Sequence, residues 1–140
     1  MIVRHTRKRP MEAWLGGFTA LLGVWIALPS TSMGSVGYFE LLEMQRELLW
    51  GLLFMAIGVA HVVSVILNGL RWWTPFARSF TAFSMAVIYG AWVWGFALVN
   101  PSSTAVFLYG AFTIASVQAL RAALFDAAKK IGAACAGIYE

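Results

Sequence analysis

Four hydrogen-bonding side chains recur at a similar depth in four apolar stretches of this chain. His61 lies near the middle of Leu48 to Leu70, which runs for 23 residues without Lys, Arg, Asp or Glu. Counted inward from the end of each stretch that carries basic residues, Thr19, His61, Tyr89 and Gln118 lie seven to eleven residues deep. A polar group at this depth in a membrane faces inward, because hydrocarbon offers it no hydrogen bond. These four residues are therefore predicted to form a polar mid-membrane layer.

His61 decides which chemistry this layer can perform, because histidine titrates near neutral pH. One interpretation is a proton or ion path, or a gate. The favoured interpretation is a neutral His61 that bonds to Gln118 or Tyr89 and holds the helices in register. A haem held by two histidines of one bundle needs a second intramembrane histidine, and His5 lies in the basic N-terminal segment instead.

Other residue patterns that carry chemistry are missing from the sequence. It has no paired carboxylates within the apolar stretches, no Ser-His-Asp set and no phosphate-binding glycine loop. Cys135 is the single cysteine, which excludes an internal disulfide and a CxxC metal site. We therefore expect a protein that is not an enzyme and that uses no cofactor or metal.

The composition indicates the kind of element that positions these residues. Hydrophobic residues make up 61% of the 140 residues and charged residues only 11%, whereas soluble domains have about 25% charged residues. The net charge of +4 does not indicate nucleic-acid binding, because the basic residues form no stripe along a helix. The chain is predicted to be an integral membrane protein.

Four spans follow from the apolar stretches, and together they predict an all-α four-helix bundle in one transmembrane domain, 1–140. The spans are predicted at about residues 11–28, 48–70, 76–99 and 103–125, with a tail at 126–140. The first stretch follows a basic segment and resembles a signal peptide, but it is longer than the usual h-region of about 7–15 residues. An uncleaved first span is the better interpretation.

A short amphipathic helix is predicted before the second span, over Tyr38 to Leu49. Glu40, Glu43 and Glu47 recur at helical spacing and form an acidic stripe suited to the outer membrane surface. The alternative is that these residues are the solvated first turns of the second span, and the sequence leaves both interpretations open.

An excess of basic residues occurs at every second connection between spans, which predicts that both termini are in the cytoplasm. The first loop carries Arg46 against three glutamates, and the second loop carries Arg71 and Arg78 without an acidic residue. The remaining charges at the two termini are Arg4, Arg7, Lys8, Arg9 and Glu12, then Arg121, Asp126, Lys129, Lys130 and Glu140.

Small residues four apart occur in every span, and in lipid they allow helix backbones to approach closely. The residues predicted to pack in this way are Gly16, Ala20, Ala56, Ala60, Ser64, Ala82, Ala86, Gly90, Ala111, Ala115, Ala119 and Ala123. Because one bundle buries only part of each helix, we also expect contacts between copies in a homo-oligomer.

Several short motifs resemble a group of small four-span membrane proteins of tailed bacteriophages and prophages. They are Trp50-Gly51, Asn68-Gly69, Asn100-Pro101-Ser102-Ser103-Thr104 and Arg121-Ala122-Ala123. The resemblance implies a holin-like protein or one that acts on the host envelope.

The expected function is a non-enzymatic, homo-oligomeric inner-membrane protein that forms or controls a membrane lesion. Alternatives are a superinfection-exclusion factor, a small accessory subunit of a larger membrane complex, and a narrow proton or ion channel that uses His61. The expected partners are the lipid bilayer, further copies of the chain and another membrane or phage protein, with no nucleic acid.

Overall fold

Four α-helices make up the regular structure of the described part of the chain. The structure is a computed structural model that describes residues 9–28, 44–67 and 71–135. The helices are α2 (Pro10–Ala27), α3 (Met44–Ile66), α4 (Thr74–Val99) and α5 (Thr104–Cys135), and no β-strand occurs in these ranges. The prediction of an all-α protein is confirmed.

Prolines and one asparagine set the helix ends. Pro10 and Pro75 stand in the first turns of α2 and α4, where a missing backbone N–H breaks no helical hydrogen bond. Between α4 and α5, Asn100 Oδ1 accepts hydrogen bonds from the backbone N–H and the hydroxyl of Ser102 at 3.2 and 2.9 Å. This Asx-type turn makes the connection tight and forces α4 and α5 to lie side by side.

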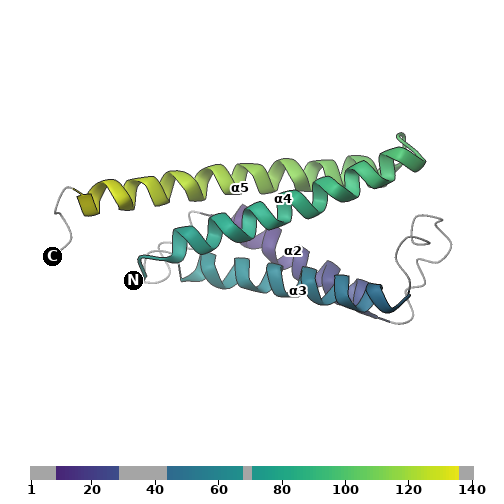
Figure 1. Ribbon diagram of the computed structural model, residues 1–140, viewed down its shortest axis with the longest axis horizontal. Helices are drawn as coiled ribbons and strands as arrows, with labels where there is room; N and C mark the ends of the chain where they lie inside the picture. Colours follow the sequence, from purple (N-terminus) through teal and green to yellow (C-terminus); the bar gives the residue numbers. More distant parts are fainter. Residues whose placement is uncertain (1–8, 29–43, 68–70, 136–140) are drawn as a thin grey trace.

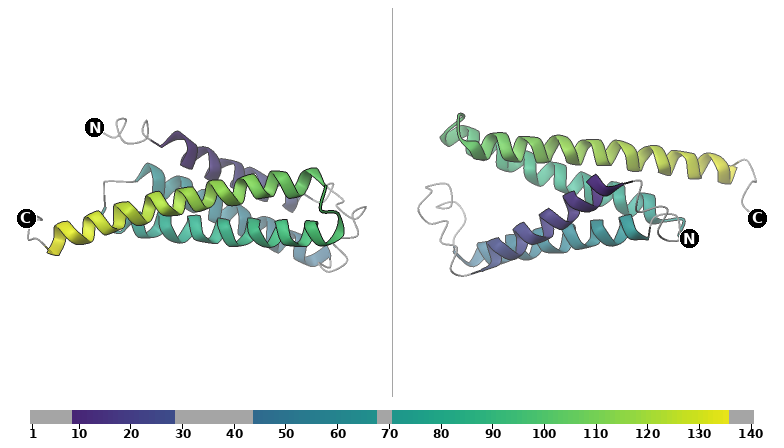
Figure 2. Two further views of the ribbon diagram at one scale, coloured as in Figure 1. Left: turned by 90° about the horizontal axis from the view of Figure 1, so that it is seen from above. Right: turned by 180° about the vertical axis from the view of Figure 1, so that it is seen from behind.

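The helices form two hairpins, one of α2 with α3 and one of α4 with α5 (Figures 1 and 2). Each helix makes most of its contacts with its hairpin partner. The hairpins meet mainly through α3 and α4, and α4 thus lies between α5 and the first hairpin.

Glycines allow the closest approach, in the α2–α3 hairpin. A Cβ atom built on Gly58 would lie 2.6 Å from the carbonyl oxygen of Gly16, and one on Gly23 would lie 2.6 Å from that of Gly51. Both distances are too short for real atoms, so each site admits only glycine without movement of the backbone. Because both pairs are seven residues apart, the two helices meet in one antiparallel register.

This register corrects part of the predicted packing. Gly16 and Ala20 do face α3, but Ala56 and Ala60 are exposed, because α3 turns Gly51, Phe54, Gly58, His61 and Val65 inward and also buries Ser64.

The alanine stripes of the second hairpin are placed unevenly. Ala82, Ala119 and Ala123 are buried, Ala86 and Ala115 are half-buried, and Ala111 is exposed. A Cβ atom on Gly90 would meet only the methyl group of Thr113 at 3.9 Å, which is ordinary contact. Gly90 is therefore not a site of close backbone approach.

Aromatic rings fill the end of the bundle near the α4–α5 turn. Trp92 contacts Tyr109 of α5 at 5.0 Å and Phe54 of α3 at 5.2 Å between ring centroids. Phe18 of α2 stacks on Phe112 of α5 at 4.5 Å. These rings join both hairpins in one apolar core.

Three helices are long and apolar enough to cross a membrane, over Leu48–Ile66, Thr74–Leu98 and Thr104–Gly132. Large apolar side chains cover the exterior, and Trp94, Phe80 and Phe107 are each at least 70% exposed. Such a surface suits contact with lipid. The helix α2 has 18 residues, a length of about 27 Å, and is not one of these three helices. The four-span bundle and its cytoplasmic termini therefore stay predictions.

Two further predictions concern the tail after residue 125 and the amphipathic helix before the second span. The cytoplasmic tail predicted from residue 126 stays a prediction, and the structure shows that α5 continues without a break as far as Cys135. Glu40 and Glu43, and with them the start of the predicted amphipathic helix, lie outside the described residues, as does the side chain of Glu47.

Candidate functional site

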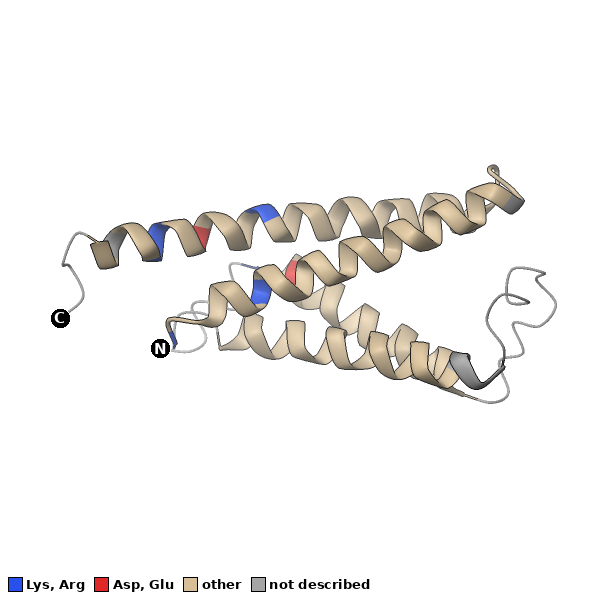
Figure 3. Ribbon diagram, in the orientation of Figure 1, with Lys and Arg blue, Asp and Glu red and all other residues tan. Residues whose placement is uncertain are grey.

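A closed ring of four charged side chains joins α2, α4 and α5 at one end of the bundle. Arg78 donates to Glu12 at 2.6 and 3.0 Å and to Asp126 at 2.9 Å. Arg9 donates to the same two carboxylates, at 2.7 Å to Glu12 and 2.6 Å to Asp126. Each arginine therefore bridges both acids, and the ring has no net charge. Figure 3 shows that the charged positions gather towards this end.

The ring is largely buried, so each of its charges needs an oppositely charged partner. The Arg78 side chain is 0% exposed and that of Glu12 9%, whereas Arg9 and Asp126 are 23% and 24% exposed. Burial tends to lower the pKa of Arg9, but hydrogen bonds and charges from Glu12 and Asp126 outweigh it and raise this pKa. A buried charge that loses its partner is strongly destabilising.

Local sequence places each member of the ring. Arg9 occupies the N-cap position of α2, just before Pro10. Glu12 lies in the first turn of α2, where the helix dipole favours a carboxylate. Arg78 lies one turn into α4, and Asp126 points back from α5 to the same level.

Sequence reasoning missed this ring, because it treated these arginines as topology signals and Asp126 as part of a tail. The signal available in the sequence was that Glu12 and Arg78 both lie in the first turn of a predicted span, and that both of these turns are predicted to lie on the cytoplasmic side.

His61 lies between the hairpins and bonds to Thr81 of α4. The distance from His61 Nδ1 to Thr81 Oγ1 is 2.7 Å. The Thr81 hydroxyl also lies within hydrogen-bond distance of the carbonyl oxygens of Ala77 and Arg78, at 2.9 and 3.1 Å, and its single proton can serve one of them. With that proton on a carbonyl oxygen, Thr81 accepts from His61, and the imidazole proton is on Nδ1. The prediction that His61 bonds to Gln118 or Tyr89 is wrong.

The second ring nitrogen of His61 is left as a buried acceptor. His61 is 0% exposed, and its Nε2 has no hydrogen-bond partner among the described residues. A Cβ atom on Gly16 would lie 3.1 Å from the adjacent Cδ2, so this edge of the ring faces the backbone of α2. His61 can accept a proton or a donated hydrogen bond there.

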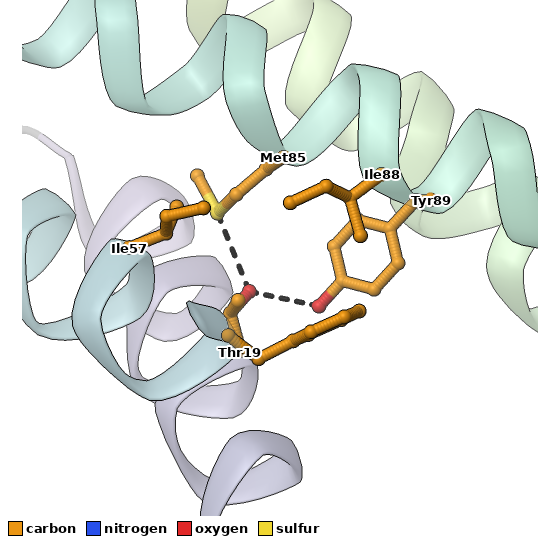
Figure 4. Close-up of a pocket in the computed structure, with 6 residues that line it drawn as sticks. Thr19, Ile57, Met85, Ile88 and Tyr89 are labelled. Carbon is orange, nitrogen blue, oxygen red and sulfur yellow. Dashed lines mark hydrogen bonds between the residues drawn. The ribbon is translucent and has the colours of Figure 1, made fainter. Parts of the chain in front are cut away.

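Thr19 and Tyr89 form a separate polar contact deeper in the bundle (Figure 4). The Thr19 hydroxyl donates to the Leu15 carbonyl at 2.8 Å and lies 2.8 Å from the Tyr89 hydroxyl and 3.3 Å from the Met85 sulfur. The Tyr89 hydroxyl therefore donates to Thr19, which joins α2 to α4 in apolar surroundings.

The structure thus brings together only part of the predicted polar layer. Thr19, His61 and Tyr89 are buried between the hairpins, but in two separate contacts. Gln118 is exposed, because successive helical residues are about 100° apart and its neighbour Ala119 faces α4. The layer as predicted is not formed.

The ring and the two polar contacts together form a neutral connection between hairpins. Each ring carboxylate accepts from two guanidinium groups, so neither is free to act as a general base. Within the described residues, no group of three His, Cys, Asp or Glu side chains is placed to hold a metal. The arrangement can hold the helices together, and it leaves one buried imidazole nitrogen of His61 without a partner among the described residues.

Comparison of this chain with protein families, with curated proteins and with solved structures found no match.

Proposed function

We propose that this protein is a non-enzymatic, homo-oligomeric protein of a bacterial inner membrane that forms or controls a holin-like lesion. The resemblance to small phage membrane proteins supports the lesion, and the three long apolar helices are compatible with the membrane. In this proposal the described bundle is the closed form.

The observation that carries the proposal is the location of the polar side chains between the two hairpins. The contacts Glu12–Arg78, Thr19–Tyr89 and His61–Thr81 each join one hairpin to the other. Inside the first hairpin, by contrast, the close contacts are between glycine backbones. Separation of intact hairpins therefore exposes polar groups and leaves the glycine contacts unbroken.

Apart from His61 of α3, those groups lie on one face of α2 and one face of α4. Glu12 and Thr19 are seven residues apart on α2, and Arg78, Thr81 and Tyr89 share the buried face of α4. In an oligomer of opened bundles, these faces line an aqueous path while the apolar exterior stays in lipid. Opening thereby supplies a polar lining, whereas the described exterior of the closed bundle is covered mainly by large apolar side chains.

A second candidate function is binding to another membrane protein, as a superinfection-exclusion factor or an accessory subunit. Gln118 and Arg121 favour it, because both are exposed on α5 within the candidate span Thr104–Gly132. Polar side chains in lipid are costly, and a partner helix that covers them removes that cost.

A disulfide across the hairpins tests the lesion. In a Cys135→Ser background, His61→Cys with Thr81→Cys joins α3 to α4, and Gly90→Cys with Thr113→Cys joins α4 to α5 inside one hairpin. The membrane potential of expressing cells and dye release from liposomes are measured for each variant, in its oxidised form and in its reduced form. We expect oxidation to block leakage only in the cross-hairpin variant, and reduction to restore it.

Leakage that persists in the oxidised cross-hairpin variant contradicts an opening between hairpins. Expressing cells that keep their membrane potential and resist phage genome entry support the binding function instead.

A further inference from the structure

An apolar groove with a basic rim lies beyond the charged ring, between the start of α4 and the end of α5. Its volume is about 590 Å³, and its lining is Trp72, Phe76, Lys130, Ile131, Ala134 and Cys135. Volumes of this size hold small-molecule ligands or acyl chains. Neither the ring nor the contacts between hairpins use these side chains.

The charge around the groove is positive. Lys130 Nζ donates to the Arg71 carbonyl oxygen at 2.9 Å, which ties the end of α5 to the approach to α4 and leaves two N–H donors on the ammonium group. Arg71 and Lys129 lie next to the groove in sequence, and Lys129 also sits over the Phe125 ring at 4.5 Å. None of the lining residues is acidic, and nearby Asp126 is neutralised by two arginines.

The side chains of the groove suit the boundary between hydrocarbon and headgroups. Trp72, which is 76% exposed, and Phe76 are aromatic residues of the kind that occupy this level. Asp126 of the charged ring and Lys130 are four residues apart on α5, so Lys130 lies one helical turn beyond the ring. A lipid here can place a chain against Trp72, Phe76 and Ile131 and its phosphate at Lys130.

We propose that this groove binds one anionic phospholipid, with an acyl chain on the apolar lining and the headgroup phosphate on Lys130. Basic pockets between helix ends bind anionic headgroups by the same combination of charge and apolar contact. The bound lipid connects the end of α5 to α4. Without it, the Lys130–Arg71 contact connects these segments through a single hydrogen bond. This site does not depend on lesion formation.

Native mass spectrometry of the full-length protein in detergent tests the site, with phosphatidylglycerol and phosphatidylcholine titrated separately. We expect one retained phosphatidylglycerol at a concentration roughly fivefold below that for phosphatidylcholine, the effect of one cation near a headgroup. Lys130→Gln removes this difference. Trp72→Ala weakens the binding of both lipids but keeps the preference.

Matched controls are Arg121→Gln, which removes an exposed cation from the same helix, and Trp94→Ala, which removes an exposed tryptophan elsewhere. Both should bind like the wild type. Equal retention of the two lipids by the wild-type protein overturns the proposal. An equal loss of preference in Arg121→Gln and Lys130→Gln also overturns it, because the attraction is then diffuse. A second copy of the chain that displaces the lipid overturns it in favour of an interface between copies.

Discussion

At the scale of single residues, we expect the largest losses of folding stability from changes in the ring of Arg9, Glu12, Arg78 and Asp126. Burial of four charges is costly, and their mutual attraction repays it only while every charge has a partner. Arg78 is the critical member because it is fully buried and bridges both carboxylates. Arg9 makes similar contacts but is partly exposed, so water can replace it.

We expect Arg78→Gln to lower the free energy of unfolding by about 3–5 kcal/mol, and Arg9→Gln by about 1 kcal/mol. Glu12→Gln with Arg78→Gln removes one charge of each sign and leaves Arg9 paired with Asp126. The double variant should therefore lose less than the sum of its single variants. Unfolding in detergent measures these differences, with Arg121→Gln as an exposed control. Strict additivity would show that the ring does not act as a unit.

His61 and Thr81 carry the second prediction at this scale. His61→Leu leaves the Thr81 hydroxyl without its donor and should cost about 0.6–2 kcal/mol, whereas His61→Gln keeps a polar contact and should cost less. Nitrogen NMR of the imidazole should find the proton on Nδ1. A proton on Nε2 would mean that Thr81 donates to Nδ1 instead. A pH-dependent flux in liposomes that both variants lose while the fold stays intact supports a proton path.

At the scale of elements, glycine spacing fixes how α2 and α3 pack. Gly58 faces the backbone of Gly16 and Ala20, and Gly23 faces that of Gly51 and Met55. A methyl group at either site cannot be accommodated by turning a side chain, because the atoms it meets belong to the backbone. The first hairpin is therefore held by close backbone packing, whereas the contact between the hairpins depends on side chains.

We expect Gly58→Ala and Gly23→Ala each to destabilise the protein by about 1–3 kcal/mol, the usual cost of overpacking. Gly17 and Gly110 are the matched controls, since a Cβ atom at either meets nothing within 4 Å. Alanine there should be neutral or stabilise the helix by up to about 1 kcal/mol. Thermal unfolding in detergent separates the two groups, and equal effects at all four sites contradict the close contact.

At the scale of the whole molecule, the start of α2 and the end of α5 lie at the same end of the bundle, joined by the Arg9–Asp126 ion pair. Lys129 and Lys130 lie at that end, and the sequence adds Arg4, Arg7 and Lys8 just before α2. Such an excess of basic residues is retained in the cytoplasm during insertion. The fold thus agrees with an even number of crossings.

Reporter fusions test this topology. A reporter after Ser35 should be periplasmic and one after Glu140 cytoplasmic, because α2 and three further helices then each cross once. Alkaline phosphatase and green fluorescent protein activities give the two locations. Both reporters on the same side would mean that α2 does not cross the membrane.

The sequence by itself determined the helical class, the approximate bounds of the described helices apart from the end of α5, and the apolar character of three candidate spans. These depend on local composition, on proline and asparagine at helix ends, and on the length that a bilayer requires. It also identified Thr19, His61 and Tyr89 as inward-facing, because a polar side chain in an apolar stretch has few alternatives.

Only the tertiary structure decided which groups meet. Thr81 rather than Gln118 pairs with His61 because the rotation of α4 and α5 about their axes sets which face is buried, and residue depth says nothing about rotation. The glycine pairs depend on the register between α2 and α3. The charged ring unites residues from three helices, and Arg9 and Asp126 are 117 positions apart in the chain. Depth along a helix is a local property that spacing reveals, whereas rotation and register are fixed by packing between helices.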